Sequence, residues 1–222
     1  MIGVETEYGL VGRRGDAVRN ARLSGGEAAG RLFTPIEREH ASSNVFLRNG
    51  GRLYLDVGSH PEYATAECAS VADLLVHERA GDELLTRLAR RAEADAAAEG
   101  EPVQLRLFKN NVDSHGNSYG CHENYSIDRA LDLPMLAGAL TPFLVTRQVL
   151  CGTGRWTADG FSISQRAEVL HAELSSMTTR ARPLINTRDE PLADPAKFRR
   201  LHVISGDSNL SEPSAMLKVG SM

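Results

Sequence analysis

Two glutamates stand two residues apart near the N-terminus, in the segment Ile-Gly-Val-Glu-Thr-Glu-Tyr at residues 2–8. The alternation predicts a strand, and residues two apart in a strand share a face, so Glu5 and Glu7 project together. Three more acidic residues lie in or next to predicted extended segments: Asp56, Glu62 and Glu67. Gathered on one sheet, these carboxylates would repel one another unless a cation lay among them. Oxygen-rich sites with one or two histidines suit Mg²⁺ or Mn²⁺.

A second strand carries three different functional groups on one face. Arg52, Tyr54 and Asp56 alternate with apolar residues, which we expect on the opposite face: Leu53, Leu55 and Val57. Later in the chain, His122 and Asn124 point to one side of a predicted strand. His202 points away from its apolar neighbours in another. Several strands therefore offer one apolar face for helices and one face of carboxylates, imidazoles and a phenol.

Mg²⁺ held by such residues usually also holds substrate phosphates. Four arginines are available to neutralise phosphate or acyl-phosphate charge: Arg52, Arg180, Arg182 and Arg188. The alternative is the ordinary polar outer face of an antiparallel sheet. Residue types and alternation leave both open.

Other catalytic motifs are missing from the sequence. Position 126 is serine, so the His122-Glu123 pair lacks the second histidine of a zinc-protease HExxH motif. The chain contains no GxSxG nucleophile elbow. Gly152-Thr-Gly154 lacks the third glycine of a dinucleotide-binding fingerprint and predicts a turn.

Composition narrows the class of protein. The 222 residues carry a net charge of −4, which argues against a nucleic-acid partner. Apolar stretches fall far short of the roughly 20 residues that a membrane span needs, and the N-terminus lacks the pattern of a signal peptide. The three cysteines, none at CxxC spacing, indicate a reduced, cytoplasmic protein without a structural zinc.

The elements that must position these residues follow from periodicity and turn signals. Ser43–Leu47 and Arg52–Val57 predict a hairpin, and residues 63–67 a third extended piece after a break at His60-Pro61. Residues 12–31 predict a loop, with a short helix near 27–33. Residues 70–99 predict a long helix that Gly81 can kink, and residues 134–150 a helix broken or bent near Pro142. The order of elements indicates an α+β fold with helices on one face of a largely antiparallel sheet.

The last twelve residues predict the start of a helix capped by Ser211. Its apolar stripe, which includes Met216, Leu217 and Val219, stops before it has anything to pack on. We therefore expect an incomplete domain.

Several blocks of sequence together resemble one family. The first is Ser-Asn-Val-Phe-Leu-Arg-Asn-Gly-Gly-Arg-Leu-Tyr-Leu-Asp-Val-Gly-Ser-His-Pro-Glu-Tyr-Ala-Thr-Ala-Glu-Cys at 43–68. Gly-Val-Glu-Thr-Glu-Tyr-Gly at 3–9, Ser-Tyr-Gly-Cys-His-Glu-Asn-Tyr at 118–125 and Arg-Arg-Leu-His-Val-Ile at 199–204 extend the likeness over nearly the whole chain. In these blocks the chain resembles the Pup–protein ligase and Pup-deamidase (depupylase) family. The short stretch before Arg52 resembles the ligase branch.

The resemblance implies a glutamine-synthetase-like fold with a curved sheet. It implies that ATP and Mg²⁺ are used to phosphorylate the C-terminal glutamate of Pup, which a lysine of a target protein then attacks. Such conjugates are marked for a bacterial proteasome. Neither nucleic acid nor membrane is an implied partner. Residues 1–222 would form the N-terminal part of the catalytic domain, and the rest of that domain and a small C-terminal domain would be absent.

By resemblance, three residues match magnesium-site positions of the family: Glu5, Tyr54 and Glu62. Arg52 and Thr65 match ATP-contacting positions, and Asp56 matches the catalytic base. A second set of metal or neighbouring positions comprises Glu7, His122 and His202. Two alternatives remain: a depupylase that uses the same site for hydrolysis, and a catalytically incompetent fragment that binds only nucleotide or Pup.

Overall fold

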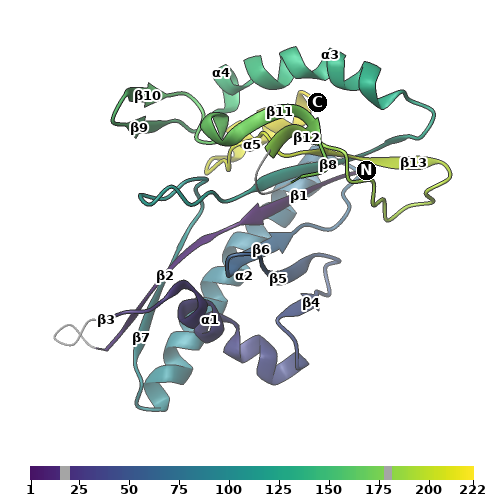
Figure 1. Cartoon of the computed structure of the whole chain (residues 1–222). Helices are drawn as coiled ribbons and strands as arrows, with labels where there is room; N and C mark the ends of the chain where they lie inside the picture. The colour runs from purple at the N-terminus through teal and green to yellow at the C-terminus, as the bar shows by residue number, and fades with distance from the viewer. Residues whose placement is uncertain (16–20, 178–181) are drawn as a thin grey trace. The chain divides into compact units, whose positions relative to one another are not determined.

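Residue contacts divide the chain into two units, which are described one at a time (Figure 1). Unit 1 contains Met1–Thr6, Glu67–Leu75 and Asn110–Met222, and unit 2 contains Glu7–Ala66 and Val76–Lys109. The structure is a computed structural model that describes residues 1–15, 21–177 and 182–222.

Unit 1 is built on five neighbouring strands in the order β11-β12-β13-β8-β1. Their bounds are β1 Ile2–Glu7, whose last residue belongs to unit 2, β8 Cys121–Asp128, β11 Leu170–Ser175, β12 Arg182–Asn186 and β13 Phe198–Val203. All neighbours pair antiparallel except β11 and β12, which are parallel. The predicted largely antiparallel sheet is confirmed in this unit.

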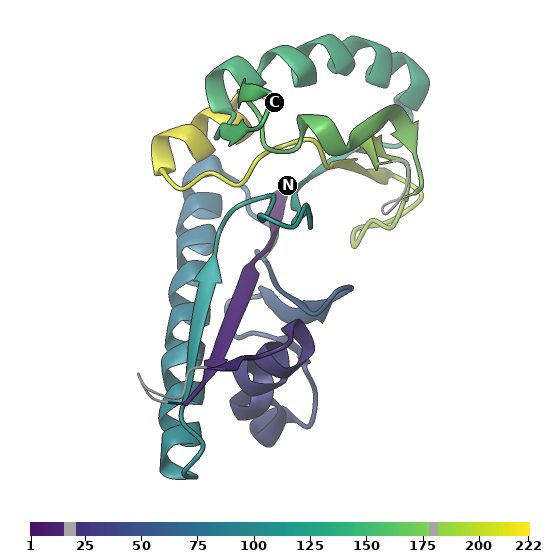
Figure 2. The same cartoon turned by 60° about the vertical axis from the view of Figure 1, so that its left-hand side comes forward.

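Helix α3 (Leu133–Thr146) lies over β11 and β12 in both ribbon views (Figures 1 and 2). Ala137 and Leu144 of α3 share a core with Ile185, Leu201 and Val203, whose side chains face away from His202. The remaining elements of unit 1 are α4 Gln148–Cys151, the hairpin of β9 Arg155–Thr157 and β10 Gly160–Ser162, the short helix Ala167–Val169, and α5 Glu212–Gly220. The predicted helical cover on one face is confirmed here.

Two helix boundaries in unit 1 test the sequence predictions. The break that we predicted near Pro142 was misplaced, because α3 runs through Pro142 and α4 begins after Arg147. The predicted cap at Ser211 is confirmed, since its side chain accepts a hydrogen bond from Ser214 N at the start of α5.

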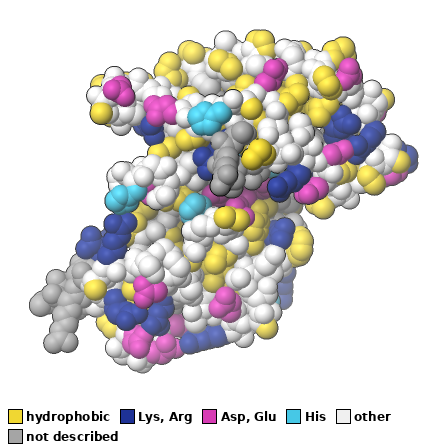
Figure 3. Space-filling model, viewed as in Figure 1, with side chains coloured by type: hydrophobic (Ala, Val, Ile, Leu, Met, Phe, Trp, Pro, Cys, Tyr) yellow, Lys and Arg dark blue, Asp and Glu magenta, His cyan; other side chains and the backbone are white. Residues whose placement is uncertain are grey.

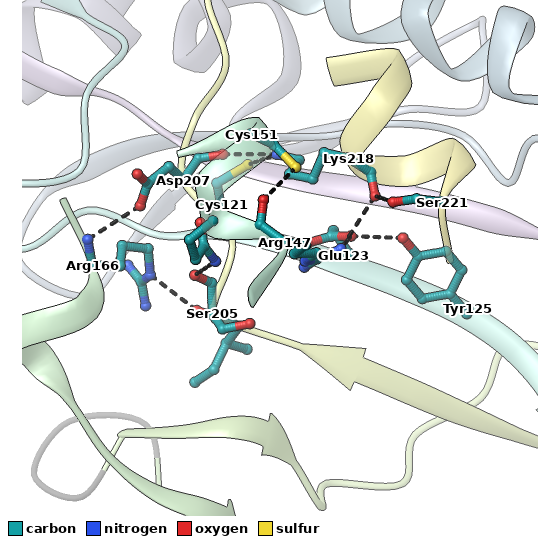
Figure 4. A network of polar contacts seen from close by, with 12 residues as sticks. Cys121, Glu123, Tyr125, Arg147, Cys151, Arg166, Ser205, Asp207, Lys218 and Ser221 are labelled. Atoms are coloured by element: carbon teal, nitrogen blue, oxygen red, sulfur yellow. Dashed lines mark hydrogen bonds and ion pairs between the residues drawn. The ribbon is translucent and has the colours of Figure 1, made fainter. Parts of the chain in front are cut away.

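A buried polar network lies beneath α3, α4 and α5 (Figure 4). Arg147 meets Glu123 through two hydrogen bonds, and the hydroxyl of Tyr125 donates to the same carboxylate. Lys218 Nζ donates to Asp207 O at 2.7 Å and to Cys121 Sγ at 3.3 Å. The buried Glu123 carboxylate and the buried Lys218 ammonium thus both have partners, as burial requires.

Unit 2 contains three neighbouring strands in the order β6-β5-β4 and a separate sheet in the order β3-β2-β7. Their bounds are β2 Gly9–Arg14, β3 Ala21–Arg22, β4 Asn44–Phe46, β5 Arg52–Asp56, β6 His60–Ala64 and β7 Val103–Phe108. The predicted hairpin is therefore confirmed as β4 and β5, which pair antiparallel.

Helix α1 (Gly25–His40) is longer than the short helix predicted near residues 27–33, and β2 replaces part of the predicted loop. Ser24 and Glu27 form a capping box at its start. Phe33 of α1 is buried with Leu53 and Tyr63 of β5 and β6 and with Leu85 of helix α2 (Val71–Ala98). Both helices thus cover the apolar face of β4–β6.

Helix α2 runs through Gly81 without a break. A Cβ atom at position 81 would lie 2.3 Å from Tyr63 Cδ1. Gly81 therefore allows the helix to approach the Tyr63 ring closely.

Strand β6 begins at His60, so the predicted break at His60-Pro61 was wrong. Pro61 pairs with Leu55 inside the strand. Proline lacks an N–H but keeps its carbonyl, and Pro61 O accepts a hydrogen bond from Tyr8 N at 2.8 Å. The earlier start brings Glu62 into the strand.

Charged side chains of both signs intermingle on the visible surface of unit 2 (Figure 3). Arg38 pairs with Glu99 and Arg91 with Glu39, both in solvent-exposed positions. These acidic residues are solvated and paired with arginines. Among the described residues, no helix is long and apolar enough to cross a membrane.

Candidate active site

The polar face of β5 and β6 carries the residues predicted for it. Tyr54 pairs with Glu62, and Asp56 pairs with His60 across the two strands. Leu53 is buried in the core on the other face. The prediction that Arg52, Tyr54 and Asp56 share one face is confirmed by this register.

Three carboxylates meet on this face: Glu7, Asp56 and Glu62. Each offers one oxygen, and these oxygens all lie within 4.8 Å of one another. Glu7 and Glu62 are buried. We call this set the three-carboxylate group. Its like charges repel, and a hard divalent cation with oxygen ligands would relieve that repulsion, so the donor set fits Mg²⁺.

Neighbouring side chains orient these carboxylates. The Tyr54 hydroxyl donates to Glu62 Oε1 at 2.5 Å, and His60 Nδ1 lies 2.9 Å from Glu7 Oε2. Such supporting bonds hold a carboxylate in position before it binds a cation. Glu67, which we expected among the clustered acidic residues, is exposed and does not belong to the three-carboxylate group.

Arg52 is held beside the three-carboxylate group by its own strand and by β4. Its guanidinium carbon lies 4.6 Å from the centroid of the Tyr54 ring and 5.5 Å from that of Phe46. Its Nε donates to Asn44 Oδ1 at 2.8 Å. Thr65 follows β6 directly and donates its hydroxyl to Ala66 O. A guanidinium fixed in this way is suited to bind phosphate oxygens.

Unit 1 contains a second cluster, formed by Glu5, His122 and His202, which we call the Glu–His–His group. Glu5 pairs with His122 across β1 and β8, and His202 pairs with Asn124 across β13 and β8. Glu5 Oε2 lies 3.5 Å from His122 Nδ1 and 3.8 Å from His202 Nε2. This confirms that both histidines lie on the face that carries Glu5.

Burial and charge set the protonation of this group. Burial raises the pKa of Glu5, but the hydrogen bond from His122 and the charge interactions with His202, His122 and Arg200 outweigh it and lower the pKa to about 2. Burial lowers the pKa of His202 to about 3. At neutral pH the group therefore offers an ionised carboxylate and a neutral His202 imidazole, the forms that ligate cations.

Arg200 determines which nitrogen of His202 is available. Its Nη2 lies 3.1 Å from His202 Nδ1, and a guanidinium has only donors, so Nδ1 accepts and Nε2 carries the proton. For Nε2 to bind a cation, its proton would have to move to Nδ1, and Arg200 would then lose its hydrogen bond to Nδ1. Sequence reasoning missed Arg200, although its position two residues before His202 places it on the same face.

We expect His202 to make the protein sensitive to acid. Because its pKa is lowered from 6.5 to about 3, His202 stabilises the fold fully above pH 6.5, and this stability is lost as the pH falls toward 3. Between pH 7 and pH 5 the wild type should lose about 2 kcal/mol more unfolding free energy than His202→Gln. Glu5, with its pKa near 2, stays ionised over this range.

Urea unfolding at the two pH values, in the presence of EDTA, measures this difference. His171 is exposed, and His171→Gln provides the matched control, which should lose as much stability as the wild type. Equal acid sensitivity of the wild type and His202→Gln would contradict the assignment.

Arg188 is exposed, and its positive charge contributes to the lowered pKa of His202 in the Glu–His–His group. Arg182 is half-buried at the start of β12. Arg180 lies outside the described residues. Arg52 lies on the face of the three-carboxylate group, and the sequence signal for it was its alternation with Tyr54 and Asp56.

The model of the Pup-ligase protein family matches residues 1–222. A Pup–protein ligase of Corynebacterium diphtheriae is 56% identical over 221 residues, which cover 100% of this chain and 46% of that protein. A Pup–protein ligase of Mycolicibacterium vanbaalenii is 55% identical and covers 100% of this chain and 49% of its own length. The chain thus spans about half the length of these relatives.

Two solved structures are similar to the chain. The crystal structure of the complex between the prokaryotic ubiquitin-like protein Pup and its ligase PafA matches with a TM-score of 0.89 and 50% identity, covering 99% of this chain and 44% of that one. The structure of PafA in complex with ADP matches with a TM-score of 0.73 and 52% identity, covering 90% and 44%.

Proposed function

Because this chain belongs to the Pup-ligase family, we propose that it takes part in ATP- and Mg²⁺-dependent ligation of the C-terminal glutamate of Pup to lysines of target proteins. Residues 1–222 would form the N-terminal part of the catalytic domain. The three free, buried cysteines suit work in the reducing cytoplasm.

The observation that carries the proposal is the three-carboxylate group beside Arg52. A carboxylate is a poor electrophile, so the Pup glutamate must first become an acyl phosphate. Mg²⁺, when bound, would neutralise charge on the phosphates during transfer. Arg52 and Thr65 would contact the nucleotide, and the donor oxygens of Tyr54, Glu62 and Glu7 would hold the cation.

Asp56 would accept the proton that the attacking lysine must lose. Glu5, His122 and His202 would hold a second cation, because their donor set combines one ionised carboxylate with imidazole nitrogens. The proposed use of ATP is supported by the similar structure of PafA, which is a complex with ADP.

Conjugation by the protein expressed from its complete gene tests the proposal. Pup ending in glutamate, a lysine-bearing protein, ATP and MgCl₂ should give a covalent adduct detected by mass spectrometry, and EDTA should abolish it. A protein that cleaves Pup conjugates but forms none would be a depupylase instead. A protein that binds nucleotide or Pup without any turnover would refute the proposed activity.

We expect Glu62→Gln to raise the Mg²⁺ concentration for half-maximal ligation by at least about 10-fold. The substitution keeps the shape of the side chain but removes the negative charge that would bind the cation. Glu67→Gln, at an exposed glutamate nearby in the sequence, is the matched control and should leave the Mg²⁺ requirement unchanged. Identical Mg²⁺ titrations for both variants would remove Glu62 from the metal site.

A further inference from the structure

Asn186 is a buried amide on the polar face of unit 1. It is the last residue of β12, is 2% exposed, and pairs with His202 of β13. His202 in turn pairs with Asn124 of β8. Asn186 therefore lies in one cross-strand row with His202, beside the Glu–His–His group.

One hydrogen bond fixes the orientation of the Asn186 amide. Its Oδ1 accepts from Arg188 N at 2.8 Å, so the other end of the amide is the NH₂ group. Among the described residues, Nδ2 is a buried donor without a hydrogen-bond partner. Leaving a buried donor unpaired is costly, and this cost is relieved if a ligand supplies an acceptor.

Arg200 provides a second donor on the same face. It lies two residues before His202 in β13, and its buried Nε also has no hydrogen-bond partner among the described residues. Two acidic side chains lie nearby, with Arg200 Nη1 3.7 Å from Glu5 Oε1 and Nη2 3.8 Å from Glu190 Oε2.

Asn186 Nδ2 and Arg200 Nε are both donors, and His202 Nε2 and Asn124 Oδ1 of the same row also have no hydrogen-bond partner among the described residues. Neither the amide NH₂ nor the guanidinium has a lone pair to give a cation, so metal binding cannot satisfy them. An oxyanion can, since it accepts hydrogen bonds and carries the charge that Arg200 complements. Asn186 and Arg200 thus favour a bound anion, whereas Glu5 favours a bound cation.

We propose that Asn186, with Arg200, binds the side-chain carboxylate of the C-terminal glutamate that is to be activated. This inference rests on the proposed function and adds a specificity-determining residue to it. A phosphate oxygen of the nucleotide has the same hydrogen-bonding chemistry, so the experiment must separate the two oxyanions. Asn186→Asp is the sharpest substitution, because it keeps the shape and the acceptor for Arg188 N and replaces the donor by an anion.

In the protein from the complete gene, Asn186→Asp should raise the KM for Pup by more than the about 10- to 150-fold that a lost hydrogen bond to a charged group causes, because the new anion also repels the carboxylate, and it should leave the KM for ATP unchanged. Asn186→Ala, which adds no repulsion, should give a smaller rise. A rise in the KM for ATP alone would assign the donor to phosphate and overturn the proposal. Unchanged values for both substrates would show that Nδ2 binds only water and would also overturn it.

Asn209→Asp is the matched control. Asn209 is another buried asparagine of unit 1, 3% exposed, whose Nδ2 donates to Cys151 O. This variant should lower thermal stability without changing the KM for Pup. If Asn186→Asp does not fold, as judged by circular dichroism, the decision passes to Asn186→Ala.

A binding measurement separates this inference from the proposed function. A peptide ending in glutamate should bind the wild type more tightly than the same peptide ending in glutamine, and Asn186→Ala should reduce that preference. Loss of ligation activity in the wild type would refute only the proposed function. Equal preference in wild type and Asn186→Ala would refute the carboxylate site.

Discussion

Replacing Asp56 by asparagine should slow ligation by about 10²- to 10⁴-fold, the range that general base catalysis supplies. A lysine ammonium has a pKa near 10.4 and must lose a proton before its nitrogen can attack. Asp56 ends β5 on the polar face, with its carboxylate in the three-carboxylate group. Asparagine has nearly the same shape but cannot accept the proton.

The two half-reactions distinguish this role from a role in metal binding. If Asp56 is the base, Asp56→Asn should still form the acyl phosphate, seen as ADP released when hydroxylamine replaces lysine. Hydroxylamine is neutral at pH 7 and needs no base, so it should restore much of the turnover. Loss of both reactions would instead place Asp56 among the metal ligands. Asp159→Asn, at an exposed turn between β9 and β10, should retain the full rate.

Alternation along a strand predicted the faces of the site because it depends only on local backbone geometry. Arg52, Tyr54 and Asp56 lie together as expected, and so do His122 and Asn124. Register between strands could not be predicted, because it depends on pairing between distant segments. The approach of His202 to Glu5 is set by β13 pairing with β8, more than 70 positions along the chain.

The errors have physical causes as well. The Gly- and Arg-rich segment before residue 31 looked like a loop, yet the capping box at Ser24 and the buried face of α1 make it a helix. Pro61 suggested a break, but the strand needs only its carbonyl at that position. One cluster of five carboxylates was expected, whereas Glu5 and Glu7 belong to different clusters. Asn186 could not be predicted because a lone amide has no sequence signature, whereas alternation with His202 could have indicated Arg200.

Replacing Arg147 by methionine should destabilise the protein by about 3–5 kcal/mol, because it leaves the Glu123 carboxylate buried without its counter-ion. Both side chains of this ion pair are 1% exposed. Arg147 donates to Glu123 Oε2 at 3.0 Å and to Oε1 at 2.5 Å, and its Nη1 also donates to Lys218 O of α5 at 3.2 Å (Figure 4). The pair thus connects α5 to β8.

Removing the Glu123 charge as well should recover part of the lost stability, even though no ion pair is re-formed. In Glu123→Gln/Arg147→Met the buried charge is gone, and the glutamine oxygen still accepts from the Tyr125 hydroxyl, whose pKa is raised by burial and by Glu123. Urea unfolding followed by circular dichroism should therefore rank the wild type first, then the double variant, then Arg147→Met. Arg87→Met removes an exposed pair with Glu83 and should cost at most about 0.5 kcal/mol. If Arg147→Met cost no more than Arg87→Met, the buried pair would not stabilise the fold.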